Sequence, residues 1–570
     1  MRKENCLILG AGLMQKPAIL SARELGYRVC VVDADDNAAC VSHADEFRKI
    51  DLKDKEAILD YARELKNSAD GLAAVFTAGT DFSASVSYVC EALALPAHSY
   101  EAALNASVKD RMRQCFKDSA VPSPDFMRIT EDDIADFGAC PENHGDKIGL
   151  GLLEKVLERL RFPFVVKPVD NMGARGCRMV RNESEFLPAV RAAVECSRTK
   201  TAILENYMRG EEYSIDALVY DGKFIVTGLA VRHIKFEPYF IEVGHTMPAV
   251  LDKNVHDQLI SVFALGAKSL GLTCGVAKAD IKYTEDGPMI GEIAARLSGG
   301  YMSGWTYPYA SDLNLTKQAL LIAAGKSPEE AISRAVPVSF DLPAAIKAES
   351  GQKSDAGGRP FELYEVPCNR TAAERAWLSI PGEVEYIENI NDYTDQAVFD
   401  VLPRPAVRIG AAVQFPRNNV EKCGNVIAVS HSREAAVLAA EDAVSNILIT
   451  LKPGNAETDA FLRGESDECE KDFPPPAFAE IPGHVFSDLS GKIPADKKTE
   501  DFIPEVLRKA EYLNTKDWNY NTILQTARKF DLLRARHPEL DARKFWESAL
   551  RAGIQGAVYY SDTLSCAGGR

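Results

Sequence analysis

The sequence predicts a multidomain protein of mixed α/β and α+β class, and three observations lead to this prediction. The chain has 570 residues, too many for one hydrophobic core and enough for roughly three to five folding units. Its first hundred or so residues alternate strand-like and helix-like stretches, whereas later stretches look like strands joined by hairpin turns. With 46% hydrophobic and 26% charged residues, the composition is that of an ordinary globular protein.

The alternation at the start predicts a first domain over residues 1–104. The strand-like stretches are CLILG, YRVCVVDAD and LAAVFTAGTD, and helical patterns cover about Leu13 to Leu25 and Lys53 to Leu65. This βαβ rhythm is typical of a small parallel sheet with helical crossovers.

Three further changes of pattern divide the rest of the chain. A basic helical stretch, SVKDRMRQCFKDSA, opens an α+β domain over residues 105–335, where VYDGKF and YTEDGPM are hairpin signals. Short strands such as GNVIAVSHS and an amphipathic helix predict a β-rich subdomain over 336–455. Residues 456–499 are interpreted as a linker, because ESDECEKDFPPPAF joins a charge run to three prolines. A helical tail over 500–570 carries no recognisable motif.

Charge and cysteine content exclude some classes of function. The net charge of -17 disfavours nucleic acid as a partner, and no apolar run is long enough to span a membrane. Thirteen cysteines without a CxxC pair are typical of reduced thiols, and the first residues lack the pattern of a signal peptide. We therefore expect a cytoplasmic protein without nucleic-acid or membrane partners.

The glycine turn after the first strand admits two interpretations. Gly10, Gly12 and Asp33 partly match a dinucleotide fingerprint, which would indicate an NAD-dependent oxidoreductase. Gln15 stands where the third glycine of that fingerprint belongs, and this weakens the match. The favoured interpretation is that the glycines permit a tight turn and a close approach of the backbone.

A predicted hairpin over residues 276–296 is the most informative segment. With the turn at Thr284 to Gly287 and the centre at residue 286, Asp280 lies opposite Glu292, and Lys278 lies opposite Ala294.

The alternation of side chains gives this hairpin one charged and one apolar face. The charged face holds Lys278, Asp280, Glu292 and Arg296, and the apolar face holds Ile281, Tyr283, Met289 and Ile293. Opposed carboxylates destabilise a sheet unless a cation lies between them, so this pair predicts a Mg²⁺ site among phosphate oxygens. A solvated edge hairpin is the alternative.

Two upstream clusters fit a nucleotide. Lys167 ends an apolar strand and precedes a glycine loop with Gly173, Arg175 and Gly176, which can fold over a triphosphate, although a purely structural turn has the same pattern. The segment ILENYMRGEE, residues 203–212, is a strand leading into a bend that can present backbone groups to an adenine edge.

Taken together with Lys109, these segments resemble the ATP-grasp superfamily in order and spacing, in particular its carboxylate-amine (L-amino-acid) ligases. The resemblance covers about residues 1–453. It implies a Rossmann-like domain before the ATP site, a two-lobed ATP-grasp domain and a β-rich C-terminal subdomain, with residues after about 456 outside it.

The resemblance also implies a role for each matching residue. Lys109 and Lys167 would contact ATP phosphates beneath Gly173, Arg175 and Gly176; Glu205 and Met208 would frame adenine, Glu212 the ribose; Asp280 and Glu292 would bind Mg²⁺ or Mn²⁺; Arg296 would stabilise the acyl phosphate. Ala294 departs from the family's E-x-N-x-R pattern and cannot bind a metal. Lys278 faces that position and is expected to share the charge balance as a second catalytic cation.

A segment from Arg232 to Pro248 resembles the substrate loop of amino-acid ligases, so Arg232 and His245 are candidate substrate contacts, while a structural role for His245 stays open. The expected function is ATP-dependent ligation of a small-molecule carboxylate to an amine through an acyl phosphate, in a possible homodimer. The alternatives are a purine-pathway carboxylase of the same fold, the oxidoreductase, and a non-catalytic ATP-binding regulator.

Overall fold

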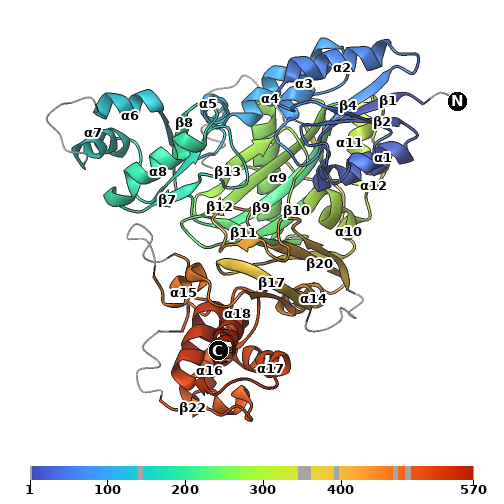
Figure 1. The fold of residues 1–570 in the computed structure, drawn as a ribbon. Helices are drawn as coiled ribbons and strands as arrows, with labels where there is room; N and C mark the ends of the chain where they lie inside the picture. Colours follow the sequence, from blue (N-terminus) through green and yellow to red (C-terminus); the bar gives the residue numbers. More distant parts are fainter. Residues whose placement is uncertain are drawn as a thin grey trace. The chain divides into compact units, whose positions relative to one another are not determined.

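The computed structural model describes residues 3–138, 146–343, 361–389, 397–465, 473–481 and 490–568 (Figure 1). The chain forms two compact units. Unit 1 comprises Met1–Met172, Gly176–Arg232 and Thr246–Ala372, and unit 2 comprises Gly173–Arg175, His233–His245 and Ala373–Arg570. Within the described ranges no helix is both long and apolar enough to cross a lipid bilayer.

The first part of unit 1 is the predicted parallel sheet. Its strands are β1 (Asn5–Leu9), β2 (Arg28–Asp33), β3 (Glu46–Lys49) and β4 (Leu72–Phe76), in the order β3-β2-β1-β4. The accompanying helices are α1 (Lys16–Glu24), α2 (Lys55–Asn67) and α3 (Ser83–Ala92). Strand residues such as Leu7 and Val31 are fully buried, as expected of a parallel sheet with helices on its faces.

A four-stranded antiparallel sheet follows α4 (Tyr100–Ser107) and α5 (Lys109–Asp118). It comprises β5 (Phe126–Thr130), β6 (Phe164–Pro168), β7 (Arg178–Val180) and β8 (Thr201–Asn206), in the order β5-β8-β6-β7. Phe164, Val166 and Leu204 belong to a core shared with α7 (Asp146–Leu157) and α8 (Glu183–Cys196). Because side chains alternate along a strand, Lys167 and Glu205 lie on the opposite face.

The third sheet of unit 1 runs β13-β12-β9-β10. Its strands are β9 (Glu211–Tyr220), β10 (Lys223–Lys235), β12 (Gly275–Thr284) and β13 (Gly287–Ala294), and β14 (Val336–Pro337) and β15 (Glu362–Glu365) extend it beside β10. The helix α9 (Lys253–Ser269) buries Leu259 and Phe263 against the apolar face. The other face carries the charged side chains of β12 and β13, and Tyr307 packs on it at Gly228. Three more helices, α10 (Tyr307–Ser311), α11 (Leu315–Ala323) and α12 (Glu329–Arg334), complete this part.

Unit 2 combines short strands with helices. The strands are β16 (Thr371–Trp377), β17 (Gly382–Asn389), β18 (Val398–Pro403), β19 (Ala412–Val413), β20 (Gly424–Ser430) and β21 (Ile447–Leu451), and β11 (Ile241–Met247) lies largely here. The helices include α14 (Arg433–Ser445), α15 (Ala456–Leu462), α17 (Ile523–Leu533) and α18 (Ala542–Gly568). The β-rich subdomain was predicted, and its strands are present.

The tail is part of the core of unit 2. Trp377 and Val426 of the β-rich part share one hydrophobic cluster with Phe530 and Trp546 of the tail. The described parts of residues 456–499, interpreted above as a linker, contribute to the same cluster through Phe461, Phe473, Phe478, Ile481 and Ile493. These large apolar side chains are buried by segments distant in the sequence. The charge run and the prolines, which are local features, do not reveal this packing. Residues 466–472 and 482–489 lie outside the described ranges.

Candidate active site

The β12–β13 hairpin has the predicted register at its charged end. Asp280 pairs with Glu292, Lys278 pairs with Ala294, and the turn closes at Thr284 and Gly287.

Between Gly291 and the turn the predicted register is wrong, because the hairpin has a β-bulge at Gly291. The register shifts between Asp280 and Ile281, so that Ile281 pairs with Ile290 and Lys282 pairs with Met289. Met289, predicted on the apolar face, therefore shares the face of Lys282, and Ile290 is the fully buried core residue.

Strand β9 adds Ser214 and Asp216, which the sequence analysis did not include, to the same face as Glu212. Glu212, Ser214 and Asp216 pair with Lys282, Asp280 and Lys278 of β12, in that order. Their alternation as E-x-S-x-D was a readable signal, since residues two apart share a face. The charged face thus extends over at least three strands.

Ion pairs connect the acidic and basic residues of this face. Asp280 Oδ2 accepts a hydrogen bond from Lys278 Nζ and lies 2.9 Å from Arg232 Nη1. Arg232 Nη1 also lies 2.6 Å from Glu212 Oε1. Arg232, predicted at the substrate, therefore lies between the acid expected at the ribose and an acid expected at the metal. Lys282 Nζ donates to the backbone oxygen of Met208, which lies beside the same row.

Glu292 lies among cations from four segments. Its Oε1 is 3.8 Å from Lys109 Nζ. Desolvation raises the pKa of this carboxyl, but Lys109, Lys278, Lys167 and Arg296 together outweigh it and lower the pKa to about 2. Glu292 is consequently an anion at any physiological pH, as a metal ligand must be.

Glu205 lies between two cations. Its Oε1 accepts from Arg113 Nε at 2.8 Å, its Oε2 lies 2.6 Å from Lys167 Nζ, and its side chain is 4% exposed. Burial raises the pKa of this carboxyl, and the two cations more than reverse that, so the pKa falls below its usual value. Arg113, not singled out in the sequence, also donates to the backbone oxygen of Gly291, the bulge residue beside Glu292.

The glycine loop has the backbone conformation that only glycine adopts readily. Gly173 and Gly176 have φ values of 67° and 70°, and a Cβ at Gly176 would lie 2.9 Å from the Cβ of Cys196. Lys109 Nζ donates to the backbone oxygen of Asn171 at 2.8 Å, just before the loop. Residues Gly173–Arg175 group with unit 2, where Asn419 N donates to Gly173 O.

Arg296 has a partner that the sequence analysis did not name. Its Nη2 lies 3.1 Å from Asp81 Oδ1, and its Nη1 donates to the backbone oxygen of Leu297. Asp81 follows the last strand of the first sheet, where Gly79 approaches Gly299 closely enough that a Cβ at Gly79 would lie 3.2 Å from the Gly299 Cα. The small parallel sheet therefore supports the loop that carries Arg296.

The candidate contact of His245 with substrate is not supported. Its side chain is fully buried and its Nδ1 lies 2.9 Å from the equally buried carboxylate of Glu374, inside unit 2. Burial raises the pKa of Glu374, and the interaction with His245 outweighs it and lowers the pKa. A histidine without exposed surface is remote from a diffusing substrate, and this favours the structural interpretation of His245.

The first glycine turn is held by the protein's own side chains. Asp33 Oδ2 accepts from Ala11 N at 2.7 Å, and Gln15 exchanges hydrogen bonds with both backbone groups of Ala78. The acid that a dinucleotide would need for its ribose is thus bonded to the turn. The structural interpretation of this turn accounts for both residues.

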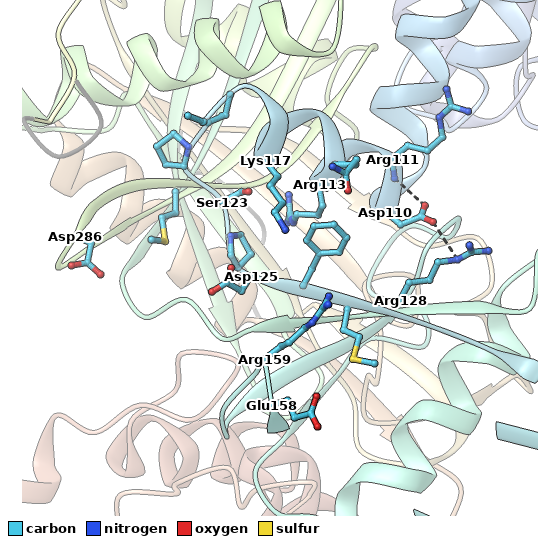
Figure 2. Close-up of a pocket in the computed structure, with 18 of the residues that line it drawn as sticks. Asp110, Arg111, Arg113, Lys117, Ser123, Asp125, Arg128, Glu158, Arg159 and Asp286 are labelled. Carbon is cyan, nitrogen blue, oxygen red and sulfur yellow. Dashed lines mark hydrogen bonds and ion pairs between the residues drawn. The ribbon is translucent and has the colours of Figure 1, made fainter. Parts of the chain in front are cut away.

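A pocket of 1320 Å³ lies beside α5 (Figure 2). Arg113, Lys117, Arg128 and Arg159 line it, and Arg128 lies 3.4 Å from Asp110. None of the residues expected to contact nucleotide belongs to its lining. Arg113 Nη1 is buried there without a hydrogen-bond partner among the described residues.

Comparisons with known proteins agree with this geometry. A family model described as the ATP-grasp domain matches residues 160–304, and one described as L-amino acid ligase C-terminal domain 2 matches residues 376–452. The chain therefore carries an ATP-grasp domain and, after it, a domain similar to the C-terminal domain of L-amino acid ligases. Enzymes of this class form carbon–nitrogen bonds, and ATP and Mg²⁺ are their cofactors.

The relatives are distant. The chain is 24% identical over 343 residues to carnosine synthase 1 of Gallus gallus, covering 57% of this chain and 36% of that protein. It is 24% identical over 255 residues to the alanine–anticapsin ligase of Bacillus subtilis (strain 168), covering 41% of this chain and 50% of that one. The match therefore spans half or less of these curated relatives.

Solved structures show the same fold. The L-amino acid ligase from Bacillus licheniformis superposes with a TM-score of 0.60 at 19% identity, covering 79% of this ATP-grasp ligase and 100% of that chain. Phosphoribosylglycinamide synthetase from Anaerococcus prevotii gives 0.55 at 18% identity, with the same coverage.

The facing carboxylates of this ligase fit one Mg²⁺ ion. Asp280 Oδ1 is buried and has no hydrogen-bond partner in the described part of the chain, so it is an acceptor that a cation would satisfy. Within those same residues no three His, Cys, Asp or Glu side chains cluster tightly enough to hold an ion alone. Two protein ligands plus phosphate oxygens are the usual arrangement for Mg²⁺.

Proposed function

We propose that this ATP-grasp ligase joins a small carboxylic acid to an amine through an acyl phosphate and releases ADP and phosphate. The observation that carries the proposal is the Asp280–Glu292 pair, opposed across two strands and surrounded by Lys109, Lys167 and Lys278. Opposed acids beside several cations are what binding of Mg²⁺ and a polyphosphate requires.

The reaction needs two displacements. A carboxylate oxygen of the acid attacks the γ-phosphorus of ATP, the bond from that phosphorus to the bridging oxygen breaks, and ADP leaves. The amine nitrogen then attacks the acyl carbon, the bond from that carbon to the phosphate oxygen breaks, and phosphate leaves with the electron pair while the nitrogen loses a proton. No covalent enzyme intermediate is required, because positioning and electrostatics suffice.

The residues of the site divide this work. Lys109 and Lys167 bind phosphate oxygens, and Gly173, Arg175 and Gly176 contribute the glycine loop of the proposed nucleotide site. Asp280 and Glu292 would hold Mg²⁺, which would supply positive charge to the phosphates. Arg296 supplies positive charge where the acyl oxygen becomes negative, and Asp81 fixes its guanidinium.

The remaining residues of the site are assigned to the adenosine part of ATP. Glu205 and Met208 are assigned to the adenine of ATP and Glu212 to its ribose. The contacts of Glu205 add a second duty, because it holds the Lys167 ammonium in place.

The proposed acid is an amino acid or a peptide-like acid. The match of residues 376–452 to an L-amino acid ligase C-terminal domain supports this choice, as do the names of the two ligases above. Residues 376–452 lie in unit 2, where they share one hydrophobic core with the tail.

The test is a screen of amino-acid pairs with Mg-ATP on the full-length chain, reading ADP and phosphate release, followed by the mass of the product. One ADP per new amide bond is expected, and Glu292→Gln is the matched inactive control. ADP release that depends on bicarbonate instead would favour the purine-pathway carboxylase. Mg-ATP binding without turnover over a broad panel would favour the regulator.

A binding measurement separates the nucleotide classes. Mg-ATP should raise the melting temperature, because a ligand that binds only the folded chain stabilises it by mass action. A shift with NADH and none with millimolar Mg-ATP would overturn the proposal.

A further inference from the structure

Lys278 lies directly opposite the position at which this chain lacks a metal ligand. It pairs with Ala294 on β13 and with Asp216 on β9, and its ammonium donates to Asp280. We propose that the Lys278 ammonium takes the place of a second metal ion, so that this ligase works with a single divalent cation in its complex with ATP. The inference rests on the proposed ligase function and deepens it.

The protein donors suffice for one ion only. Ala294 has no side-chain oxygen, and the carboxylates of Asp280 and Glu292 are the acids that face each other on this hairpin. A second ion would have to share Glu292 and be completed by phosphate and water. A fixed ammonium provides positive charge at that place without needing any ligand.

The Lys278 side chain is restricted in position by burial and by its contact with Asp280. This side chain is 12% exposed, which is unusual for a lysine without a structural or chemical role. Loss of hydration is offset by Asp280 and by the attraction of Glu292, whose low pKa depends in part on Lys278. The Lys278 side chain is therefore confined before any ligand arrives.

Arg232 is the other cation on Asp280, and the register rules it out for this role. Arg232 pairs with Glu212, and Glu212 pairs with Lys282, so these three form a row on the side of Asp280 away from Ala294. Arg232 and Lys282 therefore lie toward the ribose end, whereas Lys278 and Ala294 lie at the opposite end of the charged face.

The experiment counts bound Mn²⁺ per full-length chain in the presence of a saturating, non-hydrolysable ATP analogue, from the electron paramagnetic resonance of free Mn²⁺. Wild type should bind one ion and show no exchange-coupled pair. The double variant Lys278→Ala with Ala294→Asn should bind two ions and show coupling, as expected for ions about 3.5–4 Å apart.

Two variants make the outcome specific. Lys278→Met should lower ligation by about 10²-fold or more while the melting temperature and the single Mn²⁺ remain. Lys282→Met, on the same strand and face, should weaken binding of the analogue and leave the Mn²⁺ count unchanged. In the double variant, regained turnover should depend more steeply on Mg²⁺ concentration than in wild type.

The results discriminate this inference from the proposed function. Two coupled Mn²⁺ ions in wild type, or full turnover in Lys278→Met, would overturn the inference and leave the ligase function standing. If wild type binds neither the analogue nor Mn²⁺, the proposed function itself fails.

Discussion

Asp216 accepts hydrogen bonds from both the backbone nitrogen and the hydroxyl of Ser298, although Asp216 lies inside strand β9 and Ser298 in the loop that follows Arg296. Both side chains are buried. The contact fixes the loop that carries the proposed catalytic arginine to the centre of the charged sheet.

Burial of Asp216 makes the free energy of unfolding depend on pH. Burial raises the pKa of Asp216 to about 6, and the bonds from Ser298 only partly oppose that shift. A carboxyl whose pKa is raised in the folded state favours folding while it is protonated, so its contribution is lost as the pH rises from about 4 to about 6. The loss amounts to about 3 kcal/mol for a shift of this size.

The variant Asp216→Asn should therefore flatten the stability profile in that window. Urea unfolding between pH 4 and pH 7 measures it, as the difference between wild type and variant, which cancels the titration of other groups. A difference that does not change with pH would contradict the raised pKa.

Replacing Glu292 with Gln should keep the fold and reduce ligation at least ~10²-fold, because the neutral amide binds Mg²⁺ poorly. Steady-state turnover on the identified substrate checks this, with the melting temperature as the test of folding. Asp280→Asn should behave in the same way. Full turnover in Glu292→Gln would show that Glu292 is not a metal ligand.

Replacing Arg113 with Met should lower the free energy of unfolding by about 3–5 kcal/mol, because Glu205 stays buried after losing one of its two cations. Arg128→Met is the matched control. The Arg128 side chain is 57% exposed and 3.4 Å from Asp110, so its loss should cost less than about 1 kcal/mol. Denaturant titration compares the two, and equal effects would argue against the buried connection.

Replacing Arg296 with Lys should lower kcat more than it raises the KM for ATP, because a cation aimed at developing charge acts mainly in the transition state. Asp81→Asn should produce a smaller change in the same direction, since it only positions the guanidinium. Unchanged kcat with a raised KM would place Arg296 at the nucleotide instead.

A chain that ends at Pro453 should lose the fold of unit 2. Phe530 and Trp546 are fully buried in the cluster that also holds Trp377, and removing them leaves a large apolar surface exposed. Limited proteolysis should cut residues 376–452 rapidly in this truncation and slowly in the full chain. If the truncated chain instead resists proteolysis and its residues 376–452 unfold cooperatively, this subdomain folds without the tail and the prediction is wrong.

The hairpin was readable from sequence because its determinants are local. A two-residue turn and strict alternation placed Asp280 opposite Glu292 without any tertiary information. The same alternation predicted the wrong register between Gly291 and the turn, because a bulge depends on contacts with segments outside the hairpin. Here Ile290 N donates to Pro122 O and Arg113 bonds to Gly291 O.

The sequence by itself determined the order of the domains, the charged hairpin and the glycine loop, because periodicity, turn residues and motif spacing are properties of neighbouring residues. Only the tertiary structure decided which side chains from distant segments share a site. It brought Arg113 to Glu205, Asp81 to Arg296 and Asp216 to Ser298, buried His245 against Glu374, and packed the tail into unit 2. Burial and long-range pairing depend on the whole fold, and no local pattern records them.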